Sequence, residues 1–161
     1  MRDKDGISAA VTFLRLATDA ASAGRSVLDL YDDLEREHGV HLTSQLSLTI
    51  PGTTEVMRRL RAAPPRTLGG QPVDAITDYA DPGTGLPRSD VLAFRAGHDR
   101  VVIRPSGTEP KVKSYLEIVE PVPPGGLTAA RLAAQRRLHP LREAVSTLLA
   151  GMPSITDRRD R

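Results

Sequence analysis

Two apolar-patterned segments joined by a seven-residue loop constrain the fold of this chain more than any other feature. Residues 101–103 form an apolar run that leads into the loop, and residues 111–119 lead out of it with apolar side chains at alternate positions. Apolar segments of this length, bounded by Gly, Pro and Ser, are typical of β-strands. We therefore expect two strands connected by residues 104–110, with the apolar face of the second strand packed on helices.

The connecting loop, with the sequence RPSGTEP, carries groups that bind anions. Arg104 offers a planar fork of N–H donors. Ser106 and Thr108 offer hydroxyls, and Gly107 lets backbone N–H groups turn inward with no Cβ in the way. Consecutive N–H groups beside a guanidinium form a concavity suited to phosphate. The alternative is an ordinary hairpin turn in which the two hydroxyls bond their own backbone.

Two stretches of the chain resemble parts of a known enzyme family. The sequence RPSGTEPKVKSYLE, which begins at Arg104, resembles the phosphate-binding loop in the last domain of the α-D-phosphohexomutases, the phosphoglucomutase and phosphomannomutase family. The sequence RDKDGISAA, which begins at Arg2, is similar to the segment that closes the sugar-facing part of the third domain of that family and opens its last helix. The two matches occur in the order of the family, so the resemblance extends to about Val122.

The resemblance implies that this part of the protein grips the substrate phosphate that is not reacting. The residues implied to hold that phosphate are Arg104, Ser106, Gly107 and Thr108. The lysine side of the outgoing strand starts next to the loop, so Lys113 or Lys111 can add positive charge to a bound phosphate. Lys4 matches a lysine that points toward the sugar phosphate and is a candidate for assisting proton transfer.

The activity implied by the resemblance is that of an isomerase that moves a phosphoryl group between the 1- and 6-hydroxyls of a hexose. In the family a phosphoserine exchanges phosphate with the substrate, Mg²⁺ sits at that serine, and a sugar bisphosphate serves as intermediate and activator. The serine loop, the Asp-rich magnesium loop and the Glu-Glu-Ser-Gly sugar loop are missing from this sequence. We therefore expect a C-terminal fragment with no metal ligands, inactive without the N-terminal domains of the same enzyme. A phosphopentomutase of the same family and a non-catalytic phosphate-binding module remain alternatives.

The composition agrees with a cytoplasmic enzyme and disfavours other classes. The chain has no cysteine, which leaves no disulfide framework and no thiolate metal site. No stretch approaches the roughly 20 apolar residues that span a bilayer, so we expect no membrane partner. The net charge is only +2, with three Tyr, two Phe and no Trp, which argues against a nucleic-acid-binding domain. The expected partner is a phosphosugar.

The pattern along the chain predicts an α+β fold. We expect a small, mostly antiparallel sheet of four strands with helices on one face, preceded by two helices left from the preceding domain. Residues 1–42 would be the helical remnant of the third domain, 43–150 the C-terminal phosphate-binding domain, and 151–161 a disordered tail. Because the two leading helices lack the sheet that they would cover, we expect their apolar faces to be poorly buried.

Local sequence features place most of these elements. Gly24 is placed to end the first helix, and Ser26 can cap the second, with Asp29 as its capping-box partner. Apolar and polar side chains alternate over residues 46–50, and this pattern predicts the first strand. Further strands are expected at 73–79 and 91–96, and the last helix from about residue 128. Pro140 lies inside that last helix and should kink or split it.

Overall fold

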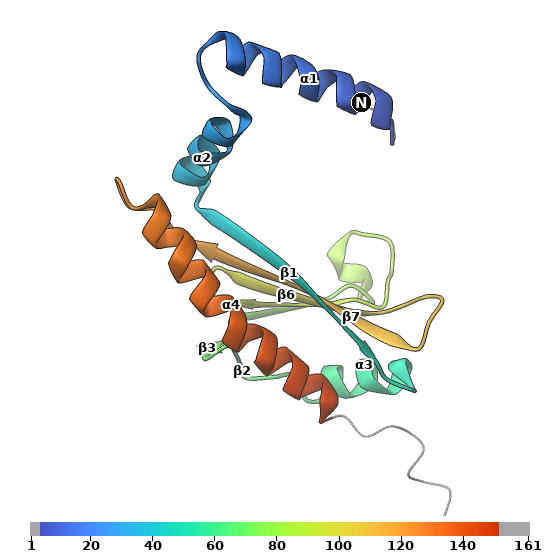
Figure 1. Cartoon of the computed structure of the whole chain (residues 1–161). Coiled ribbons are helices and arrows are strands. Elements are labelled where there is room, and N and C mark those ends of the chain that lie inside the picture. Colours follow the sequence, from blue (N-terminus) through green and yellow to red (C-terminus); the bar gives the residue numbers. More distant parts are fainter. Residues whose placement is uncertain (1–3, 152–161) are drawn as a thin grey trace, which may run out of the picture.

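The strand pair expected from the sequence forms the centre of a sheet in the computed structural model, which describes residues 4–151 (Figure 1). The strands of this sheet are β1 (Val40–Thr49), β4 (Ala75–Asp78), β5 (Leu92–Ala96), β6 (Asp99–Pro105) and β7 (Lys111–Glu120). They lie in the order β1-β7-β6-β5-β4, and every neighbouring pair is antiparallel. The α+β class is therefore confirmed, although the sheet has five strands and not four, since each of the five segments expected to be strands joins it, including the short edge strand β4. A separate hairpin of β2 (Thr67–Leu68) and β3 (Gln71–Pro72) turns at two glycines with positive φ.

Alternation along the strands gives the sheet one buried face. On β6 and β7 the buried residues are Asp99, Val101, Ile103, Val112, Ser114, Leu116 and Ile118. Apolar residues from α3 (Thr53–Ala62) and α4 (Leu127–Ala150) complete this core. The alternate residues of the strands stay exposed or half-buried, and we call the surface that they form the open face. Its members on the three strands nearest the loop are His41, Thr43, Gln45, Ser47 and Thr49 on β1, Arg100, Val102 and Arg104 on β6, and Lys111, Lys113, Tyr115, Glu117 and Val119 on β7.

Helix α4 runs across Pro140 without being split. Of the two outcomes expected for this proline, a kink or a split, the split does not occur. Pro140 itself is exposed, whereas Ala134 before it and Leu141 after it are buried against the sheet. Packing on both sides of the proline thus keeps the helix continuous, although proline removes a backbone hydrogen bond.

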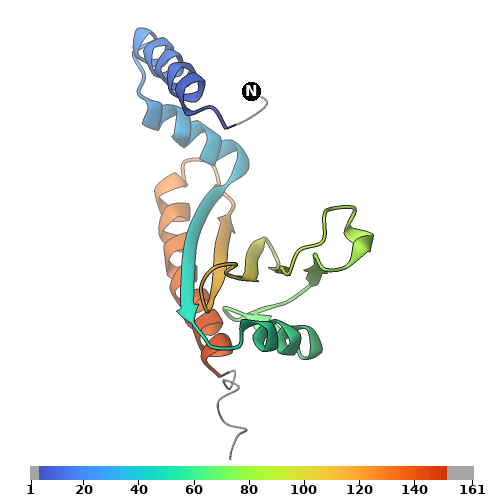
Figure 2. The ribbon, with the colours of Figure 1, turned by 90° about the vertical axis from the view of Figure 1, so that its right-hand side faces the viewer.

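The two leading helices form as expected and stand apart from the sheet. In α1 (Gly6–Ser22) the Asp5 carboxylate accepts hydrogen bonds from the first turn, and α2 (Val27–His38) begins with the expected capping box of Ser26 and Asp29. Figures 1 and 2 show α1 projecting away from the sheet, beyond α2. The apolar faces of both helices are poorly buried: the side chains of Ile7, Leu14 and Leu28 are 81%, 64% and 73% exposed.

Ion pairs join α2 to the rest of the protein. The guanidinium of Arg131 on α4 binds the carboxylates of Asp32 and Glu35 on α2, and Glu35 is buried. The strand β1 follows α2 directly and begins at Val40, ahead of the expected domain boundary at residue 43. The expected tail lies outside the described residues except for Gly151, as do Arg2 and Asp3 of the N-terminal motif. In the part of the chain that the structure describes, no helix is both long enough and apolar enough to cross a membrane.

Candidate anion-binding site

The loop between β6 and β7 is anchored at both ends by backbone hydrogen bonds. Arg104 and Pro105 belong to β6, so the loop itself comprises residues 106–110. The N–H of Ser106 donates to the carbonyl of Lys111 at 2.8 Å, which closes the loop. The N–H of Ile50 donates to the carbonyl of Pro110 at 2.9 Å, which ties the loop to the end of β1. The position of the loop is therefore fixed by two strands of the sheet.

Several donors of this loop are left without a protein acceptor. Among residues 4–151, the hydroxyls of Ser106 and Thr108 take part in no hydrogen bond. The N–H groups of Gly107 and Thr108 donate to no acceptor in the same part of the chain. The arrangement thus differs from a turn in which both hydroxyls bond their own backbone. Hydroxyl and amide donors are available together at one loop.

Gly107 is not required by the conformation of the loop itself. Its φ is not positive, unlike that of eight other glycines in the described chain. A Cβ built at Gly107 would meet no heavy atom within 4 Å. Neither backbone strain nor crowding inside the protein therefore demands glycine here. The missing side chain instead leaves the adjacent N–H groups open to close approach from outside.

Positive charge gathers on the open face beside the loop. Arg104 and Lys113 are direct cross-strand partners on β6 and β7, and they lie on the same face. The other basic residues nearby are held by carboxylates: Arg100 donates to Glu117 at 3.0 Å, and Lys111 donates to Glu109 at 2.9 Å. Arg104 forms no ion pair with any carboxylate of the described residues.

The two carboxylates near the site are ionised and already engaged. The hydrogen bond from Lys111 lowers the pKa of Glu109, and the charge of Lys113 adds to this effect. The hydrogen bond from His41 lowers the pKa of Glu117, helped by the charge of Arg100 and opposed by partial burial. Because both carboxylates have their own cationic partners, they leave the charge of Arg104 uncompensated.

Arg104 is instead held by a neutral residue that the sequence interpretation missed. Its Nη2 donates to the phenolic oxygen of Tyr115 at 3.1 Å, and its Cζ lies 5.7 Å from the centroid of the Tyr115 ring. Tyr115 also lines a shallow depression of about 420 Å³ on the open face, with Thr43, Gln45, Arg100, Val102 and Glu117 among the other lining residues. The period of two along β7 places Tyr115 on the same face as Lys113, so the strand pattern could have indicated it.

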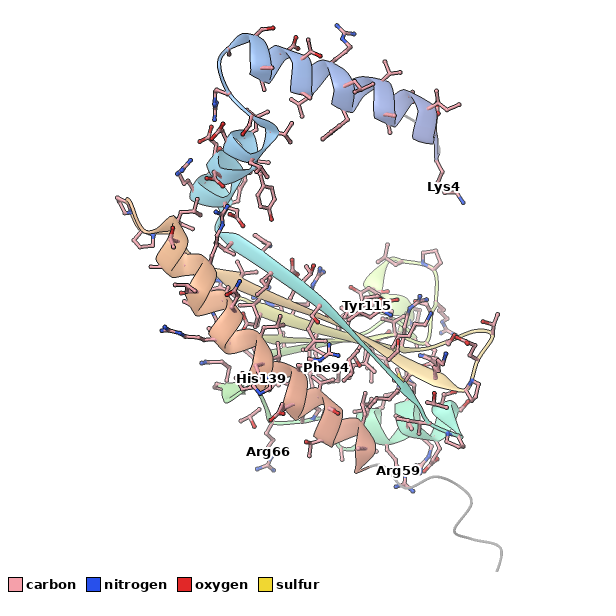
Figure 3. All side chains as sticks on the ribbon, in the orientation of Figure 1. Lys4, Arg59, Arg66, Phe94, Tyr115 and His139 are labelled. Carbon is pink, nitrogen blue, oxygen red and sulfur yellow. The ribbon has the colours of Figure 1, made fainter. Side chains whose placement is uncertain are left out.

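Lys4 is not brought together with the other expected site residues. It precedes the N-cap of α1, far from the sheet and from Tyr115 (Figure 3). Arg104, Ser106, Gly107, Thr108 and Lys113 lie together at one end of the sheet. As for metals, no group of three or more His, Cys, Asp or Glu side chains within residues 4–151 could hold an ion.

Comparison with known proteins points to one family. Residues 54–122, which include the loop and Lys113, match the family described as phosphoglucomutase/phosphomannomutase, C-terminal domain. A protein named probable phosphomannomutase from Haemophilus influenzae (strain ATCC 51907 / DSM 11121 / KW20 / Rd) is 36% identical over 121 residues. Proteins named phosphoglucomutase from Staphylococcus aureus strains bovine RF122 and USA300 are each 28% identical over 135 residues. All three alignments cover 73% of this chain and only 24% of the relative, so the chain spans about a quarter of the length of these relatives. Over residues 54–122 the chain therefore matches the C-terminal domain of the phosphoglucomutase/phosphomannomutase family, and the relatives that align with 73% of the chain carry names from that family.

Proposed function

We propose that this chain is the phosphate-gripping part of a phosphohexomutase, an isomerase that interconverts the 1-phosphate and the 6-phosphate of a hexose. The observation that carries the proposal is the uncompensated guanidinium of Arg104 beside a loop with free hydroxyl and amide donors. The relatives named phosphomannomutase and phosphoglucomutase act on phosphosugars by their names, which supports the same ligand class here.

In this proposal the loop binds the phosphate that does not react. Arg104 contributes a fork of charge-assisted donors, and Lys113 adds a point charge from the neighbouring strand. Ser106 and Thr108 donate hydroxyls, and Gly107 allows the phosphate to approach the backbone. Binding energy from this remote phosphate orients the sugar for reaction at its other end.

The phosphoryl transfer itself would take place on other domains of the complete enzyme. We propose that the phosphoserine and the Mg²⁺ ligands belong to those domains, since no cluster suited to a metal lies within residues 4–151. Magnesium would stabilise charge at the reacting phosphate. A sugar bisphosphate would be the intermediate. It would have to reorient in the active site so that its other phosphate binds the loop. In the chain alone we expect no turnover of glucose 1-phosphate with Mg²⁺ and a sugar bisphosphate present.

The test is the replacement of Arg104. In the complete protein that contains this chain, Arg104→Ala should remove charge-assisted contacts worth about 1.5–3 kcal/mol. That loss corresponds to a roughly ten- to hundredfold lower kcat/KM for the phosphosugar. Arg104→Lys should recover part of the loss, because a point charge cannot reproduce the planar fork. The melting temperature should not change, since Arg104 is exposed.

A matched control is Arg95→Ala. Arg95 is an exposed arginine on the adjacent strand β5, 3.9 Å from the Asp74 carboxylate, and its loss should leave kcat/KM unaltered. Unchanged kcat/KM in folded Arg104→Ala protein would reduce the loop to an ordinary hairpin turn. In the chain alone, the affinity for glucose 6-phosphate should fall only modestly with salt, whereas binding to a nucleic acid would weaken steeply.

A further inference from the structure

Tyr115 holds the side chain of Arg104 in a defined place on the open face. The two residues are diagonal neighbours across β6 and β7, because Tyr115 lies opposite Val102 while Arg104 lies opposite Lys113. A diagonal pair of this kind is within reach of long and aromatic side chains. The hydrogen bond of 3.1 Å between Nη2 and the phenolic oxygen confirms that the side chains meet.

Tyr115 is itself supported on both sides. Its strand β7 lies between β6 and β1, and on the β1 side Tyr115 is opposite Gln45. The half-buried ring forms part of the wall of the depression described above. An aromatic side chain packed between neighbouring strands has few rotamers available. A flexible arginine is thereby attached to a rigid support.

A phenol suits this task better than a carboxylate would. An arginine side chain that is free in solution populates many rotamers, and a ligand that binds it must overcome part of that entropy. A carboxylate partner would order the guanidinium but would also neutralise its charge, as Glu117 does for Arg100. The Tyr115 oxygen accepts one hydrogen bond and leaves both the positive charge and the other N–H groups of Arg104 to an external anion.

We propose that Tyr115 is a positioning residue that pre-orders the Arg104 guanidinium at the β6–β7 loop for binding a phosphate group. The proposal rests on the function proposed above, in which Arg104 is the phosphate clamp. Tyr115 acts through Arg104, so its contribution should vanish when Arg104 is removed.

The experiment is a titration of the chain with inorganic phosphate and with glucose 6-phosphate, followed by NMR. Tyr115→Phe removes only the phenolic oxygen and keeps the ring. The affinity for both ligands should fall about three- to tenfold, which corresponds to the loss of one hydrogen bond of ordinary strength. The Nε–H of Arg104 should become more mobile in ¹⁵N relaxation, while the melting temperature stays the same. Tyr31→Phe, a change on the exposed side of α2, is the matched control and should alter none of these quantities.

A double-mutant cycle separates positioning from other roles. In the Arg104→Ala background, Tyr115→Phe should cause no further loss of affinity. An equal loss in both backgrounds would mean that Tyr115 acts without Arg104, and this would overturn the proposal. If Arg104→Ala weakens binding but Tyr115→Phe does not, the positioning role fails and the phosphate clamp survives. If Arg104→Ala leaves the affinity unchanged, the proposed function fails first and the positioning role falls with it.

Discussion

The hydroxyl of Ser114 lies in the core of the sheet. The residue is fully buried on β7 between Leu46 of β1 and Ile103 of β6, and its oxygen has no hydrogen-bond partner among the described residues. A buried hydroxyl without a partner loses its contacts with water and gains nothing in exchange. The other buried positions of β7 hold apolar residues whose burial stabilises the fold. The burial of the Ser114 hydroxyl instead lowers the free energy of unfolding.

We predict that Ser114→Ala leaves stability unchanged or raises it by about 1 kcal/mol, because the substitution removes an unsatisfied polar group. Urea unfolding followed by circular dichroism measures the difference. Ser47→Ala, at an exposed position of β1, is the control and should change the free energy of unfolding very little. A clear loss of stability in Ser114→Ala would show that the hydroxyl has a bonding role in solution.

At the scale of elements, helix α3 has no side-chain N-cap, and all three of its arginines pair with carboxylates. Its N-cap is Gly52, which offers no side-chain acceptor to the first turn. Glu55 in that turn accepts hydrogen bonds from Arg58 and Arg59. The third arginine of the helix, Arg61, pairs with Asp78 and Asp90 instead. The arginine-rich side of α3 is therefore paired internally, in contrast to Arg104.

This arrangement predicts a specific pH dependence. Two hydrogen bonds, the stronger effect coming from Arg58 and the weaker from Arg59, lower the pKa of Glu55 from 4.5 to about 2 in the folded protein. Because the pKa in the folded state is the lower one, the ion pairs stabilise the fold above pH 4.5, and this contribution is lost as the pH falls from about 4.5 to about 2.

A carboxyl-detected NMR titration should therefore show Glu55 titrating near pH 2. Glu55→Gln should remove that part of the acid sensitivity of unfolding, whereas Glu37→Gln on the exposed side of α2 should retain it. A Glu55 midpoint near that of an ordinary glutamate would show that the arginines do not bind it in solution.

At the scale of the whole molecule, the chain consists of a well-packed sheet with its covering helices and a projecting pair of helices. The central strands and α4 share one continuous core that includes Phe94, Leu116 and Val145. The pair α1 and α2 contributes no residue to that core, and Arg131 of α4 joins α2 to the rest of the chain by ion pairs with Asp32 and Glu35. The two parts should therefore differ in local stability.

We predict that the amides of α1 exchange with solvent faster than those of β6 and β7. Opening α1 exposes little additional apolar surface, because its large apolar side chains are already about half exposed or more. Hydrogen exchange followed by mass spectrometry measures the difference directly. Equal protection in both regions would mean that α1 has found a packing surface in solution, such as a second copy of the chain; a concentration series would then reveal the association.

The sequence alone determined the features that depend on near neighbours along the chain. The alternation of residues 111–119 specified a strand with one apolar face, because side chains of a strand alternate with a period of two. Ser26 with Asp29 defined the start of α2, and Gly24, which has a positive φ, follows the end of α1 as expected. The composition of RPSGTEP marked a loop with donors suited to an anion. Among residues 4–151, the hydroxyls of Ser106 and Thr108 and the N–H groups of Gly107 and Thr108 have no protein acceptor.

Only the tertiary structure decided which groups meet across strands and helices. The start of β1 at Val40 follows from its pairing with Glu120, which lies 80 positions away in the chain. The continuity of α4 through Pro140 depends on the packing of that helix against the sheet. Ser114 is buried because it lies on the face of the sheet that is covered by helices. The partner of Arg104 is Tyr115 and not a carboxylate, because the register of β6 against β7 sets which side chains are diagonal neighbours. The alternation along a strand shows which residues share a face, but which of them become neighbours depends on how the strands and helices pair and pack in three dimensions.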